Sequence, residues 1–211
     1  MPYFLKLLRS CIVLTLVLRA STAEALVRID TQSIDLALKY GIERQGTGYA
    51  NFLGGNWLEA EDGTLLNIYT PFMLIASKGF KSGMPQEPSP EDLKKLHKRY
   101  YSFIHQFTDP RNPINVKFAV SLFGETEDFA TQYQAWIEGF GRGKTFLLKP
   151  SKQLLQAKAA LNENASVKPY EAVNAYYFRF DEVENLQDYT FKLLGPDGKI
   201  REYHIKNDRI F

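Results

Sequence analysis

The chain is poor in the residues that carry metal, redox or nucleophilic chemistry. Its 211 residues include one cysteine, Cys11, and three histidines. A single cysteine forms no intramolecular disulfide, so the stability of the fold has to come from its hydrophobic core. His97 and His105 are eight residues apart on one expected helix, and so lack the i, i+4 spacing of a zinc-binding pair, while His204 stands alone. The motifs H-E-x-x-H and G-x-S-x-G are absent. We therefore expect no metal and no cofactor.

Long apolar runs are also absent. The longest, residues 11–18, falls far short of the roughly 20 residues that a membrane-spanning helix needs. It follows a short basic segment and precedes small residues, which is the order of a secretory signal peptide. We predict that residues 1–23 are removed after Ala23, or alternatively after Ala25. The mature protein is then exported to the periplasm or the extracellular space.

Cleavage changes the charge balance. Residues 1–23 hold three of the 26 basic residues and none of the 24 acidic residues. The mature chain 24–211 therefore has 23 basic against 24 acidic residues, a net charge of −1, although the precursor has a pI near 8.5. A chain without excess positive charge is not a candidate for nucleic-acid binding. Its length favours one domain, or two small ones.

The main periodic signal in the mature chain is that of β-strands. Apolar and polar residues alternate over residues 34–40 and again over 114–122, the period of half-buried strands. Asp62-Gly63 and Gly195-Pro196-Asp197-Gly198 are tight-turn sequences between apolar runs and predict hairpins. The other expected strands lie at residues 57–60, 64–75, 146–148, 176–180, 189–194 and 200–205. Residues 128–137 fit a helix or a strand, and we favour a strand because glycines follow.

One amphipathic helix is predicted with clear boundaries. Residues 84–90 hold three prolines and form a linker, after which Ser89-Pro90-Glu91-Asp92 supplies an N-cap, a proline in the first turn and acidic residues. Apolar residues at spacings of three and four extend this helix to about 107, so residues 84–110 form a helical insertion. A second, shorter helix is predicted over residues 151–161. The fold class is thus mainly β, with α+β as the alternative: an antiparallel sandwich, immunoglobulin-like in general architecture.

Residues 139–145 (GFGRGKT) resemble a nucleotide-binding loop. A Walker A loop needs a glycine five residues before Gly143, but that position is Glu138. The loop also has to open a helix whose N-terminal amides hold the phosphates, whereas residues 146–148 look like a strand. We therefore predict a glycine turn between two strands.

Two acidic clusters, at residues 124–128 and 181–184, are the strongest indication of an enzyme. Neither matches the D-x-[DN]-x-[DN]-G pattern of a calcium loop. Glu127 and Asp181 instead suggest the carboxylate pair of a glycoside hydrolase. Solvated acidic loops explain the same residues, so the enzyme is the alternative rather than the favoured reading.

Aromatic and basic side chains supply the candidates for binding. In residues 176–180 (YYFRF), Tyr177 and Arg179 share one face, which we expect to be the outer one and to bring the two side chains together. Trp57 and Trp136 are the two tryptophans, a residue type that often anchors interfaces. The polar side of the predicted helix is basic and is a candidate for peripheral contact with an anionic membrane surface, through Lys94, Lys95, Lys98 and Arg99.

The sequence therefore favours a non-catalytic binding or interaction module of the cell envelope or extracellular space, with a protein or glycan partner. An envelope hydrolase is the alternative. A transport-associated or lipid-binding barrel comes third.

Overall fold

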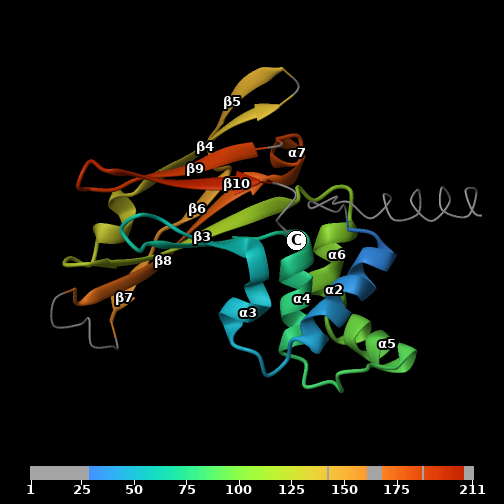
Figure 1. Cartoon of the computed structure of the whole chain (residues 1–211). Helices are drawn as coiled ribbons and strands as arrows, with labels where there is room; N and C mark the ends of the chain where they lie inside the picture. The colour runs from blue at the N-terminus through green and yellow to red at the C-terminus, as the bar shows by residue number, and fades with distance from the viewer. Residues whose placement is uncertain (1–28, 142, 161–167, 187, 207–211) are drawn as a thin grey trace, which may run out of the picture.

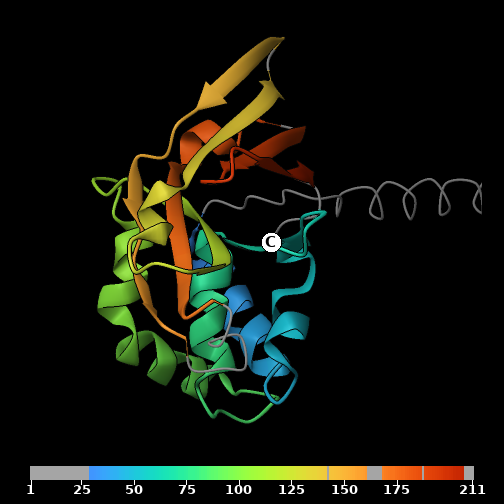
Figure 2. The same cartoon turned by 90° about the vertical axis from the view of Figure 1, so that its left-hand side faces the viewer.

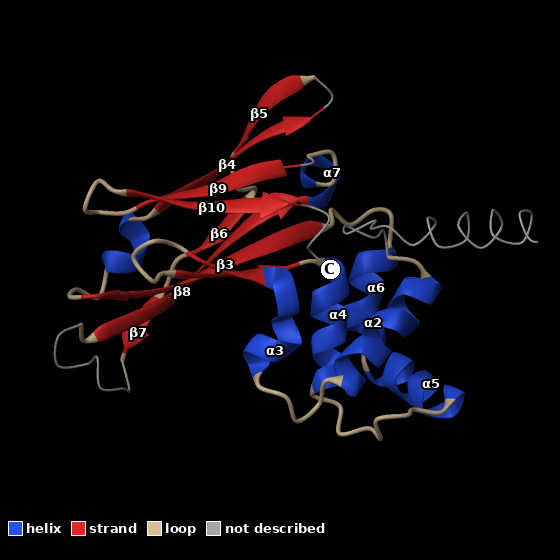
Figure 3. Cartoon of the chain, in the orientation of Figure 1, coloured by secondary structure: helices blue, strands red, loops and turns tan. Residues whose placement is uncertain are grey.

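The computed structural model describes residues 29–141, 143–160, 168–186 and 188–206. Two antiparallel sheets pack face to face, and a group of helices lies beyond one of them (Figures 1 and 3). The predicted signal peptide lies outside the described residues. No helix within the described part of the chain is long and apolar enough to cross a membrane.

The first sheet has the strand order β1-β2-β3-β8-β6, and β7 also pairs with β8. Its strands are β1 (Trp57–Glu59), β2 (Leu65–Tyr69), β3 (Asn115–Gly124), β6 (Lys152–Leu154), β7 (Ala157–Ala159) and β8 (Tyr170–Arg179). The second sheet has the order β10-β9-β4-β5. Its strands are β4 (Gln134–Gly141), β5 (Lys144–Leu148), β9 (Asp188–Leu194) and β10 (Ile200–Lys206).

The prediction of an antiparallel sandwich is confirmed. The predicted hairpins also form: Asp62-Gly63 lies in the turn between β1 and β2, and Gly195–Gly198 in the turn between β9 and β10. Gly63 and Gly198 both have positive φ, which explains why glycine occupies these positions. The strand orders do not reproduce the ABED and CFG sheets of an immunoglobulin domain, so the immunoglobulin-like part of the prediction is not confirmed.

Aromatic side chains fill the space between the two sheets. The rings of Phe118 and Phe191 stack across it with their centroids 5.1 Å apart, and Phe178 meets Phe118 edge-on at 5.3 Å. Tyr176 and Tyr203 are also almost fully buried here. The inward positions alternate along every strand with outward ones, because successive side chains of a strand point to opposite faces.

A second hydrophobic core lies among the helices, on the side of the first sheet that faces away from the second sheet (Figures 1 and 2). Its helices are α2 (Thr31–Glu43), α3 (Tyr49–Leu53), α4 (Pro71–Phe80), α5 (Pro90–Arg99) and α6 (Tyr101–Thr108). The shorter α7 (Phe180–Val183) and the 3-10 helices η1 (Gly54–Asn56) and η2 (Phe129–Gln132) lie between strands.

The predicted strand at residues 34–40 is wrong, because this segment lies in α2. Ile34, Ala37, Leu38 and Ile42 are all buried, and their spacing is that of one helical face. Leu36, which the alternation would have buried, is 54% exposed. A short segment with apolar residues at both two- and four-residue spacing satisfies either period.

The predicted strand at residues 64–75 is too long. β2 ends at Tyr69, and the side chain of Thr70 then caps α4 by accepting a hydrogen bond from the backbone N–H of Met73 at 3.2 Å. Pro71 occupies the first turn of α4, as Pro90 does in α5. Both helices therefore begin with a Thr or Ser cap followed by proline. In α4 this pair lies inside an apolar run, and in α5 it follows a linker.

Two glycines allow α2 and α4 to pack at very short distance. A Cβ atom added to Gly79 would lie 2.1 Å from the carbonyl oxygen of Leu38, and one added to Gly41 would lie 1.9 Å from that of Ala76. Any larger residue would push the helices apart. The helical core thus depends on backbone contact between two segments that are separated by two strands in the sequence.

The helix predicted over residues 90–107 is present as two helices with a break at Tyr100. The capping box forms as expected, with reciprocal hydrogen bonds between Ser89 and Asp92. These helices share their core with α2, α3 and α4, so they belong to a larger helical unit and are not a lone insertion.

The helix predicted over residues 151–161 is wrong. The described part of the segment forms β6 and β7, which pair with β8, and the backbone N–H of Ser151 donates to the carbonyl of Tyr177 at 2.7 Å. Pairing with an available sheet edge outweighs the helical propensity of alanine, leucine and lysine. Residue 161 lies outside the described residues. At residues 128–137, η2 precedes β4, so the predicted strand is confirmed only for its second part.

Candidate functional site

The outer face of the first sheet presents the pair that the sequence indicated. Tyr176 and Phe178 are fully buried, whereas Tyr177 is half-buried and Arg179 is exposed, as the alternation predicted. The pairing expected between Tyr177 and Arg179 is replaced by other contacts. Arg179 Nε donates to Asp181 Oδ1 at 3.0 Å, while the Lys152 ammonium lies 5.6 Å from the centre of the Tyr177 ring.

Tyr177 belongs to a row of alternating tyrosines and lysines across four strands. In the register of the sheet, Tyr69 of β2 pairs with Lys117 of β3, Lys117 with Tyr177 of β8, and Tyr177 with Lys152 of β6. Directly paired residues point to the same face, so the four side chains lie side by side. We call them the aromatic–lysine row. Lys117 Nζ lies 5.0 Å from the centre of the Tyr69 ring, which places each lysine beside a ring.

The two ends of the row differ in exposure. Tyr69 packs against the helical core, and its hydroxyl lies 3.1 Å from that of Tyr49 in α3. Burial, followed by this hydrogen bond, raises the pKa of Tyr69, so the ring is neutral. Burial lowers the pKa of Lys117. Lys152, at the other end, is exposed. Among the described residues no carboxylate pairs with Lys117 or Lys152. Both ammonium groups can therefore form an ion pair with an anionic group on a partner.

The neighbouring row on the same face is apolar except for Asn67. Trp57 pairs with Asn67, and this row continues through Ala119 and Ala175 to Leu154. Trp57 is 39% exposed and Leu154 is 49% exposed, while the two alanines between them are buried. The row therefore has a large, exposed side chain at each end and small, buried alanines between them. The fold brings Trp57 and Tyr177, 120 residues apart in the sequence, onto one face.

Trp136 is not part of this surface. It lies on β4, on the outer face of the second sheet, and its indole N–H donates to Glu138 at 2.9 Å. Glu138 and Glu202 hold the ammonium of Lys192 between them, at 2.8 and 3.1 Å. Hydrogen bonds from Lys192 and then Trp136 lower the pKa of Glu138. Trp136 therefore belongs to an ion-paired network on the opposite side of the sandwich.

The basic residues of α5 form a third surface, on the helical unit. All four are exposed, and Lys95 pairs with Asp92 at 3.4 Å: Lys94, Lys95, Lys98 and Arg99. His97, on the same helix, lies 2.8 Å from Asp35 of α2 and so joins the two helices. The surface fits contact with anions, but it is separate from the aromatic–lysine row.

The glycine-rich segment is a turn, as predicted. β4 runs through Gly141 and β5 begins at Lys144, and the two strands pair with Gly141 opposite Lys144. Gly143 has a φ of 75°. No helix follows the turn, so the backbone amides that bind phosphate in a Walker loop are not arranged here.

The proposed carboxylate pair does not assemble. Glu127 follows the Gly124 end of β3, whereas Asp181 follows Arg179, which pairs with Asn115 at the other end of the same strand. At the rise of a β-strand these ends are about 30 Å apart, while glycoside hydrolases need their two carboxylates within about 10 Å. Its hydrogen bond with Arg179 also lowers the pKa of Asp181, the opposite of what a general acid needs. The part of the chain that the structure describes contains no group of three potential metal ligands.

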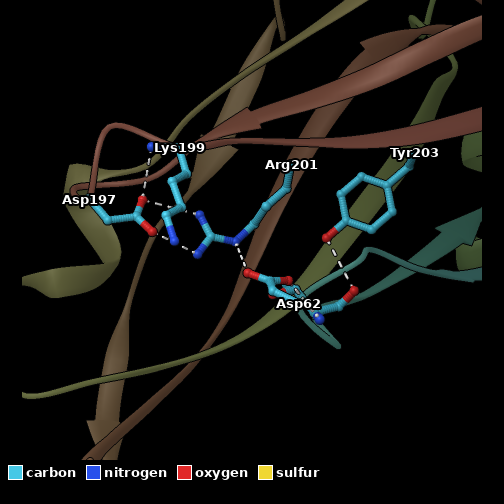
Figure 4. Close-up of polar contacts among 6 residues, drawn as sticks. Asp62, Asp197, Lys199, Arg201 and Tyr203 are labelled. Atoms are coloured by element: carbon cyan, nitrogen blue, oxygen red, sulfur yellow. Dashed lines mark hydrogen bonds and ion pairs between the residues drawn. The ribbon is translucent and has the colours of Figure 1, made fainter.

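A polar cluster that no sequence pattern indicated joins the two sheets (Figure 4). Arg201 of β10 donates to Asp62, in the turn between β1 and β2, at 2.6 Å, and to both carboxylate oxygens of Asp197, in the turn between β9 and β10. The Tyr203 hydroxyl donates to the carbonyl of Thr64 at 3.3 Å. Both aspartates were expected in turns, but nothing in the sequence indicates that the turns meet.

The contacts in this cluster favour the ionised form of both aspartates. Hydrogen bonds from Arg201 lower the pKa of Asp197. Burial alone would raise the pKa of Asp62, but hydrogen bonds from Thr64 and Arg201 outweigh it, and the net shift is downward. Arg201 is held by two carboxylates and is largely buried, so the cluster stabilises the contact between the sheets.

Comparison with known protein families finds no family model that matches the chain, and no curated protein sequence matches it significantly.

Proposed function

We propose that the chain is an exported, non-catalytic binding module, and that it contacts its partner through the outer face of the first sheet. The observation that carries this proposal is the aromatic–lysine row of Tyr69, Lys117, Tyr177 and Lys152. Ordinary outer faces of sheets mix charges of both signs, whereas this row joins aromatic rings to lysines that no described carboxylate neutralises. Aromatic side chains and unpaired cations are both typical of binding surfaces.

The chemistry of the row favours an acidic glycan. Lys117 and Lys152 lie two strands apart, so their attachment points are separated by about 10 Å. Tyr177 lies between them in the register, and Trp57 adds an exposed ring on the same face. A chain of uronic acids presents flat apolar sugar faces and regularly spaced carboxylates, which complements rings that alternate with ammonium groups.

Calorimetric titration with polygalacturonate oligosaccharides tests the proposal. Tyr177→Ala and Lys152→Ala should each weaken binding, by about tenfold for the ring, because central aromatic residues supply most of the energy of an interface. Lys144→Ala is the matched control, since Lys144 is also exposed but lies at the start of β5, in the second sheet. Oligosaccharides of neutral glucose should bind more weakly than the uronates.

The proposal fails if the wild type binds neither class of oligosaccharide, or if Lys144→Ala weakens binding as much as Lys152→Ala does. A protein partner is then the remaining candidate for this face. Because Trp57 and Leu154 are exposed beside the row, Trp57→Ala should weaken binding to either kind of partner.

A further inference from the structure

The exposed side of α5 carries a group of basic side chains at the periphery of the helical unit (Figure 1). Residues three or four apart on a helix are neighbours on its surface, so the basic residues of α5 form one patch. Leu93 and Leu96 lie on the opposite side of the helix and are buried in the helical core. We call the patch the α5 basic surface: Lys94, Lys95, Lys98 and Arg99.

Most of the charge on this surface is not neutralised within the protein. Lys95 forms an ion pair with Asp92 at 3.4 Å. Among the described residues, no carboxylate forms an ion pair with the other three basic side chains. Glu91 is the other acidic residue of α5, and it lies exposed one turn before Lys94. The helix therefore presents a net positive charge, which an anionic surface complements.

A hollow between α2 and α5 adjoins the α5 basic surface, with a volume of about 350 Å³. Lys39 of α2 and Lys94 of α5 both line it, and both are exposed. Two other lining residues, Asp35 and His97, contact each other between the helices at 2.8 Å. The Asp35 carboxylate therefore has a partner already, whereas the two ammonium groups have none among the described residues. The hollow has about ten times the volume of one water molecule in the liquid, so it admits a phosphate group.

An exposed aromatic ring follows the α5 basic surface along the chain. Tyr101, the first residue of α6, is 65% exposed and comes three positions after Lys98. Its ring stacks on the imidazole of His105, with the centroids 5.5 Å apart and the planes 11° from parallel. Tyrosine is enriched at the boundary between membrane and water, because its ring is apolar and its hydroxyl is polar. An exposed tyrosine beside the lysines therefore favours a lipid surface over a soluble polyanion as the partner.

We propose that the α5 basic surface docks on the headgroup layer of an anionic phospholipid membrane. A lipid phosphate occupies the hollow between Lys39 and Lys94, and Tyr101 lies among the headgroups. The contact is peripheral, because the apolar side of α5 is already used in the helical core. It lies on the helical unit and does not involve the aromatic–lysine row, so either site can fail without the other.

Co-sedimentation with sucrose-loaded vesicles tests the inference. The wild type should bind vesicles made of equal parts of phosphatidylglycerol and phosphatidylcholine, and not vesicles of phosphatidylcholine alone. Salt should release it, because dissolved ions screen charges at a surface. Lys94→Gln/Lys98→Gln should weaken binding by about tenfold, because each lysine near an anionic membrane adds to the attraction. Lys144→Gln/Lys149→Gln is the matched control: it removes two exposed lysines at the edge of the second sheet and should leave binding unchanged.

Two single substitutions test the details of the surface. Glu91→Gln removes an acidic group from α5 and should strengthen vesicle binding, a gain that a loss of structure does not produce. Lys39→Gln should weaken binding as much as Lys94→Gln alone does, because both side chains line the hollow.

Lys152→Ala separates this surface from the aromatic–lysine row, since it should leave vesicle binding unchanged. Circular dichroism verifies that each variant is folded, and if Lys94→Gln/Lys98→Gln does not fold, Glu91→Gln and Lys39→Gln decide. The inference is overturned if the wild type does not prefer anionic to neutral vesicles, if the two double variants weaken binding equally, or if Lys152→Ala weakens it as much as Lys94→Gln/Lys98→Gln does. Binding to soluble polyphosphate without binding to vesicles would likewise overturn it.

Discussion

Arg201 and Asp62 are 139 residues apart in the sequence, yet the arginine Nε lies 2.6 Å from the aspartate Oδ2. Arg201 belongs to β10, the edge strand of the second sheet, and Asp62 to the turn that follows β1, the edge strand of the first. The contact therefore joins the two sheets at one side of the sandwich (Figure 4). Because Arg201 is only 14% exposed and also holds Asp197, this contact has more energetic weight than a surface ion pair.

Removing this arginine should destabilise the sandwich. We expect Arg201→Ala to lower the free energy of unfolding by about 1–3 kcal/mol, because two carboxylates lose charge-assisted hydrogen bonds. Urea unfolding followed by circular dichroism measures the change. Arg111→Ala is the control: Arg111 forms an equally short pair with Asp109 but is 85% exposed, so its loss should leave stability nearly unchanged. Equal effects of the two substitutions would contradict the role given to Arg201.

The same cluster predicts a dependence of stability on pH. The pKa values of Asp62 and Asp197 are lowered in the folded protein, so both aspartates bind protons more readily when unfolded. Their stabilisation is then complete above the unfolded pKa of about 4 and is lost as pH falls through the folded values. Urea unfolding between pH 7 and pH 3 should show this loss. Arg201→Ala should flatten the acidic part of the curve, and a curve of unchanged shape would contradict the assignment.

Neighbouring residues on β8 should respond in opposite ways. Phe178 is fully buried between the sheets, so Phe178→Ala should cost about 3–5 kcal/mol. Tyr177→Ala should cost much less stability, because that side chain lies half-buried on the outer face, and should act mainly on binding. Thermal unfolding of the two variants compares them directly. If Tyr177→Ala were the more damaging, the outer face of the first sheet would have a structural role in place of a binding one.

The contact between α2 and α4 should not tolerate a methyl group. Gly79→Ala would place a Cβ atom 2.1 Å from the carbonyl oxygen of Leu38, so the helices have to separate, at a cost of about 1–3 kcal/mol. Gly48→Ala is the control, since a Cβ there meets nothing within 4 Å and the residue precedes α3 with negative φ. Chemical denaturation measures both. Comparable stabilities would mean that the helices adjust without strain.

Export predicts a defined mature N-terminus. Mass spectrometry of the protein isolated from its native cells should find Glu24 or Leu26 as the first residue, because small residues precede both positions. A variant with Lys in place of Leu16 should block processing, since a charge interrupts the apolar run. Intact Met1 on the cytosolic protein would remove both the proposed location and the argument from the charge of the mature chain.

Local patterns were sufficient where one signal dominates a segment. The strand at residues 114–122, the turns at Asp62-Gly63 and Gly195–Gly198 and the capping box at Ser89 all follow from a few adjacent residues. Strand alternation, positive φ at glycine and helix capping each depend on residues that are adjacent in the sequence. They can therefore be predicted from a short segment. The inward direction of Phe178 and the outward direction of Tyr177 were predicted for the same reason.

Local patterns failed where two readings competed. Residues 34–40 satisfy both the strand and the helix period, and α2 forms because its apolar face meets α4 in the helical core. Residues 152–159 have good helix formers, yet they pair with the available edge of β8. In both cases the secondary structure of the segment depends on its contact with a distant segment. It cannot be predicted from neighbouring residues alone.

The sequence by itself determined the sandwich, its hairpins and the outward face of β8, because each depends on interactions between residues close in the chain. Only the tertiary structure decided which side chains meet. The register of four strands assembled Tyr69, Lys117, Tyr177 and Lys152 into one row, and the packing of the two sheets brought Arg201 against Asp62. Such sites arise from contacts between distant segments, and their geometry exists only after the hydrophobic cores have formed.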